Sequence, residues 1–432
     1  MSYLQIVDLV FLIITILFTL LTIHYVIFAI VGLFAKKKFA KTEKKLKYGI
    51  VVSARNEEEV IANLIDSIKK NKYPQENLQI FVVAHNCTDN TAQIARDNGA
   101  IVYEYHNSNE KTKGYALKFL FDRIKDDYGV ENYDGFFVFD SDNLLTENYI
   151  DTMNDAFIAN GNNCVITSFR NSKNFGSNLI SAMYGLFFMQ GCRYEMRGRT
   201  VLGCSTRVSG TGFLISSDIL VNGWPYVTLT EDWEFTADRI LDGTRIIYCD
   251  EAEFFDEQPT KVKIMLRQRL RWAKGHLLVC LTRYAKLVKN FFRPKRKGGS
   301  EHKFSTYDIS VNILPLPVLS LSMFVVQAVL LAFAPLLGYS AATIWLNWAI
   351  DFAKSVAWYY VIMVLAGIIL IIAEHKRIKH VNFFVMLGAI LLWPLFLFIS
   401  IPLEFLCIFI KNVGWKTIPH KHATTIENIK KS

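Results

Sequence analysis

Long apolar stretches near both ends of this 432-residue chain constrain its fold more than any other feature. Residues 9–34 are almost wholly apolar, and this run is long enough to cross the ~30 Å hydrocarbon core of a bilayer. A lysine cluster follows the run, whereas a signal peptide carries its basic residues first, so we expect an uncleaved anchor. Three further apolar segments cover 309–337, 357–372 and 381–410. The sequence therefore predicts a membrane protein with a water-soluble middle part.

The charge pattern predicts on which side of the membrane the middle part lies. Seven lysines between positions 36 and 47 are opposed by Glu43 alone, which places this segment in the cytoplasm by the positive-inside rule. These lysines would lie against anionic headgroups, and this accounts for much of the net charge of +9. No basic and aromatic pattern repeats along the soluble stretch, so nucleic acid is not an expected partner. The seven scattered cysteines contain no C-x-x-C pair and predict neither disulfides nor a zinc site.

Strand-like and helical stretches alternate through the first part of the soluble region. We expect strands at 48–53, 78–84, 100–105 and 135–139, and helices at 57–70, 91–98 and 113–125. This alternation is typical of a parallel sheet with both faces covered, and such sheets bind ligands beyond the carboxyl ends of their strands. Asp89 and Asp140 fall in or near such positions. An α/β domain with a site at that edge is therefore predicted.

The first chemical motif is Asp140-Ser141-Asp142, which follows an apolar strand. Residues two apart in an extended chain point the same way, so both carboxylates can converge on one ligand. A hard divalent cation such as Mg²⁺ or Mn²⁺ takes oxygen ligands and keeps substrate phosphates in its coordination shell. The motif is either such a metal site or a solvated turn after a strand.

Two more motifs lie further along the chain. Thr230-Glu231-Asp232 precedes a helix, so its side chains either cap that helix or supply a general base. Gln268, Arg271 and Trp272 stand at i, i+3 and i+4 and hence on one helical face, where Arg271 can form bidentate hydrogen bonds to phosphate. The surrounding stretch, 260–292, is basic and amphipathic. We expect it to lie in the membrane interface or, alternatively, to pack on the soluble domain.

In order and spacing these motifs resemble the D, D-x-D, T-E-D, Q-x-x-R-W pattern of membrane-bound inverting family-2 glycosyltransferases, which include cellulose, chitin and hyaluronan synthases. The resemblance spans roughly residues 48 to 280. It implies a GT-A-type nucleotide-sugar domain with a mixed, mostly parallel sheet, inserted between an N-terminal transmembrane helix and a C-terminal transmembrane helical bundle. It further implies that Asp142 contacts Mg²⁺ or Mn²⁺, that Asp140 contacts the nucleotide, and that Asp232 is the catalytic base.

The resemblance also assigns roles to other positions. The expected nucleotide-sugar-binding residues are Ser53, Glu57, His85, Asp89, Lys113, Asp140, Gln268 and Arg271; the acceptor-binding residues are Gly210, Gly212, Glu231 and Trp272; and a gating loop would contain Trp415 and Thr417. Two positions depart from the family pattern. Arg55 replaces a tyrosine, and His85 replaces the aspartate that accepts a hydrogen bond from uracil. A neutral imidazole can still accept one hydrogen bond, and Asp89 is near in sequence, so a UDP-sugar stays the expected donor.

These expectations divide the chain into five regions. They are an anchor at 1–35, a cytosolic GT-A domain at 36–260, interfacial helices and a basic linker at 261–300, transmembrane segments at 301–411, and a cytosolic tail with the gating loop at 412–432. A cytosolic tail would require one apolar segment to be re-entrant or split, and prolines at 315, 317, 335, 394 and 402 interrupt the first and third segments. The expected location is the cell membrane, with several crossings and a cytoplasmic catalytic domain.

The implied function is processive polymerisation of a β-linked polysaccharide from a UDP-sugar, UDP-GlcNAc or UDP-glucose. The closest alternative is a single transfer onto a lipid, because ceramide glucosyltransferases resemble the same pattern. A remote alternative is a catalytically silent membrane scaffold. A bundle this small could need a partner subunit or a homo-oligomer to enclose a channel for a polymer.

Overall fold

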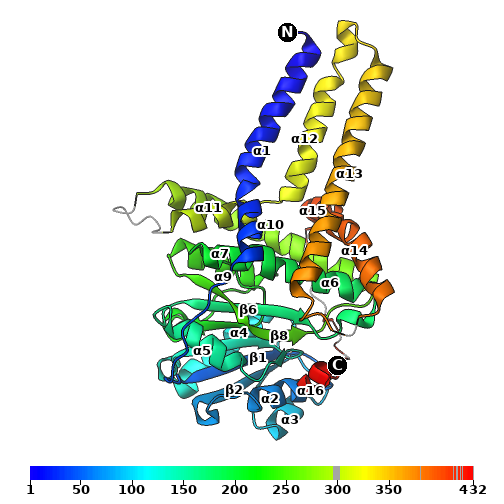
Figure 1. Ribbon diagram of the computed structural model, residues 1–432. Helices are drawn as coiled ribbons and strands as arrows, with labels where there is room; N and C mark the ends of the chain where they lie inside the picture. Colours follow the sequence, from blue (N-terminus) through cyan, green and yellow to red (C-terminus); the bar gives the residue numbers. More distant parts are fainter. Residues whose placement is uncertain are drawn as a thin grey trace.

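The computed structural model describes residues 1–294, 302–379, 381–411, 413–414, 417–418, 420 and 422–431. A sheet domain lies at one end, a layer of helices covers it, and long helices rise from that layer (Figure 1). The last described segment returns to the sheet domain, far from the N-terminus (Figure 1).

An eight-stranded mixed sheet in the order β3-β2-β1-β4-β7-β6-β8-β5 forms the centre of the domain. Its parallel pairs are β1 with β2, β1 with β4, β2 with β3 and β6 with β8, so the predicted mixed, mostly parallel sheet is confirmed. The strands are β1 (Tyr48–Ala54), β2 (Leu78–His85), β3 (Ile101–Tyr105), β4 (Gly135–Asp140), β5 (Leu144–Leu145), β6 (Val165–Ser172), β7 (Phe213–Ser216) and β8 (Ile246–Asp256). The carboxyl ends of β1, β2 and β4 meet at one edge.

Helices cover both faces of the sheet, and alternating residues of each strand supply two cores. Ile50 and Val52 of β1 face one core and Val51 faces the other, as the two-residue period of a strand requires. The helices of this domain are α2 (Ile61–Lys69), α3 (Thr91–Asp97), α4 (Lys113–Tyr128), α5 (Tyr149–Ile158), α8 (Ser217–Leu220) and α9 (Glu231–Leu241). The helix expected from residue 57 begins four residues later, because Asn56 has a positive φ and the Glu57 N–H donates to Thr91 Oγ1 in a turn.

A layer of helices separates the sheet from the long apolar helices (Figure 1). It contains α6 (Leu179–Gln190), the π-helical turn η4 (Gly191–Met196), α7 (Arg197–Val201), α10 (Val262–Phe292) and α11 (Lys303–Asn312). The predicted helix at 260–292 matches α10, which packs against both α9 of the sheet domain and the later helix α15 (Ser400–Phe409).

Within the described residues, four helical segments are long and apolar enough to span a bilayer, namely Tyr3–Phe34, Leu316–Leu337, Ala341–Glu374 and Phe383–Phe409. They contain α1 (Tyr3–Phe34), α12 (Leu316–Leu331), α13 (Ala341–Glu374), α14 (Phe383–Phe398) and α15. The apolar segment at 309–337 is broken at Pro315, one of the prolines expected to interrupt it, since α11 ends before this residue and α12 begins after it. The segment expected at 357–372 begins earlier, at Ala341. Its first half contains the exposed ion pair of Asp351 and Lys354, and these charges kept that half out of the apolar segment expected from the sequence.

Of the two forms considered for residues 381–410, one tilted helix or a broken pair, the structure has the broken pair. α14 packs on α6, and α15 packs on α10. Arg269 of α10 stabilises the break, since its guanidinium donates to the Phe396 carbonyl at 2.6 Å and also to Ser400 Oγ. After this break the tail reaches the sheet domain, where Ile426 and Ile429 of α16 (Ile426–Lys431) are buried against Leu144 and Phe255.

Candidate active site

A cavity of about 980 Å³ begins at the sheet edge where β1, β2 and β4 end, and continues between α1 and α13. All three sequence motifs contribute to its wall although up to 132 positions separate Asp140 from Trp272. The predicted site residues that line it are Ser53, Glu57, His85, Lys113, Asp140, Asp142, Gly210, Glu231, Asp232, Gln268, Arg271, Trp272 and Thr417. Asp89 and Gly212 are not among the lining residues, and Trp415 lies outside the described part of the chain.

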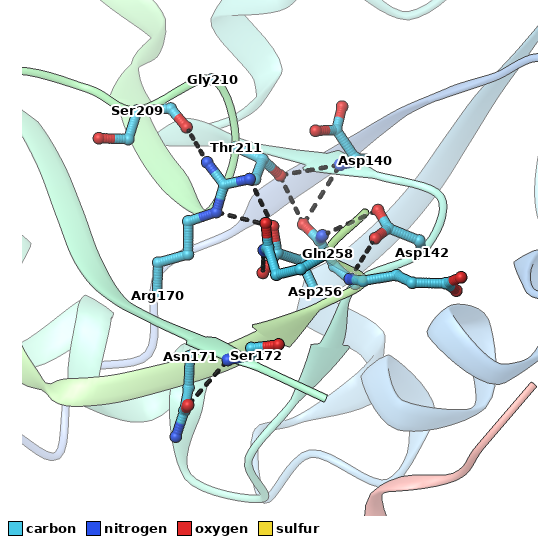
Figure 2. A network of polar contacts seen from close by, with 12 residues as sticks. Asp140, Asp142, Arg170, Asn171, Ser172, Ser209, Gly210, Thr211, Asp256 and Gln258 are labelled. Carbon is cyan, nitrogen blue, oxygen red and sulfur yellow. Dashed lines mark hydrogen bonds and ion pairs between the residues drawn. The ribbon is translucent and has the colours of Figure 1, made fainter. Parts of the chain in front are cut away.

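The two aspartates after β4 have different partners. The Lys113 ammonium forms an ion pair with Asp140 and donates to the Gly210 carbonyl at 2.7 Å. Asp142 is only 4 % exposed and accepts hydrogen bonds from the Glu257 N–H at 2.7 Å and from Asn143 Nδ2 at 3.2 Å (Figure 2). Burial alone would raise the pKa of Asp142, but the nearby charges of His420 and Lys173 outweigh it and hold this pKa below its usual value. Asp142 is therefore ionised at neutral pH.

The donor set at Asp142 fits a divalent metal that arrives with a nucleotide. Each of its carboxylate oxygens accepts one hydrogen bond and keeps a further lone pair for a cation. No group of three His, Cys, Asp or Glu side chains placed to hold a metal occurs in the described ranges. The remaining ligands would then be phosphate oxygens and water, as is usual for Mg²⁺.

An ion pair that the sequence analysis missed holds the wall beside these aspartates. Arg170 on β6 binds Asp256 at the end of β8 through Nε at 2.7 Å, and its Nη1 donates to the Ser209 carbonyl at 2.9 Å (Figure 2). The guanidinium also lies over the Phe188 ring, with its carbon 3.7 Å from the ring centre. Arg170 therefore joins the sheet, the loop before β7 and α6. The two charged residues are 86 positions apart, so no short motif marks the pair.

The loop held by Arg170 brings two glycines to the predicted base. Gly210 and Gly212 have φ angles of +78° and +69°, which other residues rarely adopt, so this turn requires glycine at both positions. A Cβ on Gly210 would lie 3.7 Å from Asp232 Oδ2, whereas a Cβ on Gly212 would collide with the Phe254 ring. Gly210 therefore borders the reaction site, and Gly212 permits close packing behind it.

Glu231 and Asp232 begin α9 and point to the same cavity. Thr230 is the residue at the helix N-cap, but its side chain makes no capping hydrogen bond and its Oγ1 has no partner in the described structure. Burial and the neighbouring charge of Asp232 raise the pKa of Glu231 to about 7, and burial raises the pKa of Asp232 as well. Ionisation of one of these adjacent carboxyls therefore disfavours ionisation of the other.

We expect the rate of the reaction to fall as the pH drops below about 7, because a general base must be ionised and Glu231 and Asp232 both have raised pKa values. Glu231→Gln should move the acidic limb of the kcat/KM profile to lower pH, since it removes the neighbouring negative charge. The measurement is the rate of product formation between pH 5 and 9 for both forms. An unchanged acidic limb in the variant would show that the two carboxyls do not interact.

The α10 motif lies at the same cavity, where Gln268, Arg271 and Trp272 all belong to the wall. Arg271 Nη1 donates to the Leu229 carbonyl at 2.7 Å, which holds the loop before α9. A Cβ on Gly275 would lie 2.4 Å from a Thr230 side-chain atom, so α10 approaches this loop closely. Trp272 lines the cavity and packs edge-on against Tyr184 and Phe188, with ring centres 6.1 Å apart in both pairs. The indole is thus packed against α6 and faces the cavity that the acidic pair also lines.

His85, at the end of β2, stands where the resembling enzymes have an aspartate. Its Nε2 lies 2.7 Å from the Glu110 carbonyl, which can only accept, and 2.9 Å from Asn86 Nδ2, which can only donate, so one tautomer cannot satisfy both contacts. The shorter contact, with Glu110, favours a proton on Nε2. Burial lowers the pKa of His85, hence the ring is neutral and Nδ1 is an acceptor. In the described structure Nδ1 has no hydrogen-bond partner, and His85 lines the cavity.

Asp89, which was expected to help bind the nucleotide, is not among the residues that line the cavity. Its carboxylate accepts hydrogen bonds from Thr91 and from the Glu58 N–H, and so it stabilises the turn before α3. This turn places Asp89 outside the cavity wall. The closeness of Asp89 to His85 in the sequence does not reveal that position.

A residue from the tail completes the nucleotide end of the cavity. Nδ1 of His420 lies 2.9 Å from Glu57 Oε1, and Thr417 accepts a hydrogen bond from Arg267 through its carbonyl at 3.3 Å. Burial alone would lower the pKa of His420, but Asp142 and Glu57 outweigh it and raise this pKa to about 10. His420 is therefore an imidazolium close to two acidic site residues, Asp142 and Glu57. Its place in the site becomes visible only through its contact with Glu57, which lies 363 positions away in the sequence.

With this geometry in place, comparisons with known proteins identify the family. Residues 46–275 match the family described as Glycosyltransferase like family 2. The chain is 27% identical over 268 residues to the probable glycosyltransferase YdaM of Bacillus subtilis (60% of this chain and 61% of that protein). It is 25% identical over 265 residues to a probable glycosyltransferase of Sulfolobus acidocaldarius (57% and 55%). The chain thus spans less than two thirds of the length of these curated relatives.

Among solved structures, the mannosyltransferase PcManGT from Pyrobaculum calidifontis, in complex with GDP-Man and Mn²⁺, is similar over 86% of this chain and 98% of its own. The TM-score is 0.56 and the sequence identity is 17%, a likeness that concerns the fold. The family match covers more than half of the chain and contains all three motifs. The chain therefore belongs to glycosyltransferase family 2, and its sheet domain has the GT-A-like fold of that family.

Proposed function

We propose that this enzyme transfers a hexose, with inversion, from a uridine diphosphate sugar to the hydroxyl group of a membrane lipid. One observation carries the proposal. A single cavity runs from Lys113 and Asp140, past Asp232 and Trp272, to walls supplied by the apolar helices α1 and α13. A donor bound at the sheet edge and an acceptor arriving from the bilayer would meet at Asp232.

The side chains around Asp232 support this chemistry. Asp232 would remove the proton from the acceptor hydroxyl, whose oxygen attacks the anomeric carbon in line with the departing diphosphate. Lys113 and Arg271 line the cavity and would bind the diphosphate oxygens. A Mg²⁺ or Mn²⁺ ion held by Asp142 would neutralise charge on the leaving group, as the Mn²⁺ in PcManGT suggests. Direct displacement needs a single base and inverts the configuration at the sugar carbon.

Two observations favour a lipid acceptor over a growing polysaccharide, although the family resemblance alone ranked the polymer first. The cavity wall between the long helices is apolar, with residues such as Ile30, Leu33 and Ile362, and would leave the hydroxyls of a sugar chain without hydrogen-bond partners. In addition, α14 and α15 pack on α6 and α10, so α1, α12 and α13 are the long helices that rise freely from the layer (Figure 1). This is a small bundle in which to enclose a channel for a polymer.

Polymerisation stays the second candidate, because Trp272 of Q-x-x-R-W lines the cavity beside Asp232, where it could stack on an acceptor sugar. Product size separates the two. We expect purified protein, given a panel of UDP-sugars with Mn²⁺ and a lipid, to form one chloroform-soluble species of defined mass. A water-soluble ladder or high polymer would instead support a processive synthase. Release of UDP without either product, or no release with any donor, would contradict both.

The neutral His85 also makes a prediction about the donor base. Its free Nδ1 accepts a hydrogen bond, which uracil N3–H and guanine N1–H can donate and the unprotonated N3 of cytosine cannot. We expect CDP to bind at least about tenfold more weakly than UDP, and His85→Ala to weaken UDP binding by about the same factor. Isothermal titration calorimetry with the two nucleotides measures both effects. His106→Ala is the control, because His106 is exposed and lies outside the cavity wall. Equal affinities for UDP and CDP would refute this role.

We further propose a multi-pass protein of the cell membrane with its catalytic domain in the cytoplasm. The lysines at 36–47 support this orientation. The tail would lie on the same side, because α16 packs on the sheet domain, and α14 with α15 would then form the re-entrant segment.

A further inference from the structure

We infer that the acceptor lipid enters sideways from the bilayer, through an opening between α1 and α13, and that its hydrocarbon chain lies along these two helices. The inference rests on the proposed function and names the route and binding site of its acceptor. It predicts that small residues facing the cavity on both helices are required for transfer to a lipid and not for binding of the donor.

The two helices present matching apolar stripes to the cavity. The apolar lining residues are Val26, Ala29, Ile30 and Leu33 on α1, and Ile362, Met363, Ala366 and Ile369 on α13; Tyr25 of α1 also lines the cavity. Both sets follow the spacing of one helical face. Each stripe covers seven residue steps, or about 10 Å of helix, which is enough for a substantial part of a lipid chain. The neighbouring positions Ile27 and Ile368 point outward and are 49% and 38% exposed.

The spacing between α1 and α13 is held by η4, which lies between their cytoplasmic ends. Arg193 of this turn donates to the Leu33 carbonyl of α1 and to Glu374 of α13, both at 2.7 Å. Tyr194 donates to the Ala366 carbonyl of α13 at 2.6 Å. On the α1 side, a Cβ on Gly32 would lie 2.1 Å from the Arg193 carbonyl oxygen, so the contact is between backbones. The opening is therefore a braced feature of the fold.

The chemistry of the walls indicates what occupies the opening. Apart from Tyr25, whose hydroxyl oxygen accepts a hydrogen bond from Asn312 Nδ2 at 3.2 Å, the side chains that α1 and α13 present to the cavity are apolar. A hydrocarbon chain therefore loses no hydrogen bonds along the two stripes, whereas water or sugar hydroxyls would. The cavity continues to Asp232 and Trp272, which places the polar end of the lipid at the general base. That end is a hydroxyl rather than a phosphate, because the Glu231 and Asp232 carboxylates would repel an anion and a phosphate oxygen needs no base to become nucleophilic.

The test introduces larger side chains into the opening, one helix at a time, and compares them with the same side chains on the outward faces. Ala29→Phe and Ala366→Phe place a ring in the cavity, and the matched controls Ile27→Phe and Ile368→Phe place the same ring on the outward face. Full-length protein is reconstituted in phosphatidylcholine vesicles with or without dioleoylglycerol as the hydroxyl-bearing probe. The measurements are UDP release from the active UDP-sugar, chloroform-soluble product, and the Kd for UDP.

We expect the cavity-facing variants to lose about tenfold or more of the lipid-dependent UDP release, because the acceptor can no longer reach its reactive position, while the Kd for UDP stays within about twofold. The outward-facing variants should keep both properties. Ala29→Leu and Ala366→Leu are milder versions that should give a smaller loss, and they serve if a phenylalanine variant does not fold, which failure to bind UDP would reveal.

Each alternative outcome identifies what has failed. Full lipid-dependent release in the cavity-facing variants, or an equal loss in the outward-facing ones, would overturn the opening while leaving the proposed function in place. A wild-type enzyme that hydrolyses its donor but is not stimulated by dioleoylglycerol would also overturn the lipid route. A wild-type product that is a polymer, or a wild type without UDP release, would instead remove the proposed function on which the inference rests.

Discussion

Replacing Asp232 with asparagine is expected to lower kcat on the order of 10³-fold, because the amide cannot remove a proton from the acceptor hydroxyl. Binding of the UDP-sugar should change little. Asp232 lies at the start of α9, where its Oδ1 accepts from the Trp233 N–H at 2.9 Å, and an asparagine oxygen can keep this contact. The measurement is UDP release under saturating donor, combined with the Kd for UDP from calorimetry.

The matched control for this variant is Asp238→Asn on the same helix, where the carboxylate pairs with Arg283 at 2.7 Å outside the cavity wall. Loss of that partly exposed ion pair should affect stability slightly and leave kcat unchanged. Asp232→Asn activity within tenfold of the wild type would exclude Asp232 as the base. Glu231 would then become the candidate, since it lines the same cavity.

The second large effect is expected at Asp142. We expect Asp142→Asn to lower kcat/KM on the order of 10²- to 10³-fold, because the diphosphate would lose the electrostatic stabilisation that a held cation supplies. The variant should also require a higher Mn²⁺ concentration for half-maximal rate, since an amide oxygen is a weaker ligand for a hard cation than a carboxylate. A titration of UDP release against Mn²⁺ measures both quantities.

A comparison of the two variants makes this result specific. Additional Mn²⁺ should partly restore Asp142→Asn and should not restore Asp232→Asn, because these two residues serve different steps. Asp218→Asn provides the control, as Asp218 lies on α8 and does not line this cavity. Equal Mn²⁺ requirements for the wild type and Asp142→Asn would show that Asp142 does not hold the metal. Its hydrogen bond from the Glu257 N–H would then be its main contribution.

Local patterns in the sequence were sufficient for the first half of the sheet domain. β1, β2, β3 and β4 lie within about a residue of their expected limits, because each is a short apolar run bounded by turn-forming residues. The position of Asp140 at the end of β4 follows directly, and so does its meeting with residues that follow β1 and β2. The grouping of Asp140, Asp232 and Trp272 was predicted from a family resemblance, and the cavity contains all three.

Other parts of the site were beyond sequence reasoning because they depend on contacts between distant residues. The Arg170–Asp256 pair forms only when β6 and β8 become neighbours, and His420 reaches Glu57 only because α16 packs on the sheet domain. Asp89 shows the converse case. Its closeness to His85 in sequence suggested a shared role, but the turn before α3 directs its carboxylate to Thr91.

The sequence by itself determined the class of this protein, since the apolar runs, strand patterns and three motifs are local or family-wide features. Only the tertiary structure decided the tautomer of His85, the break between α14 and α15, and the spacing of α1 from α13. Each of these depends on a backbone carbonyl or an arginine that a distant segment supplies, at Glu110, Arg269 and Arg193. A single hydrogen bond of this kind has no periodicity along the chain, so it becomes visible only after the chain has folded.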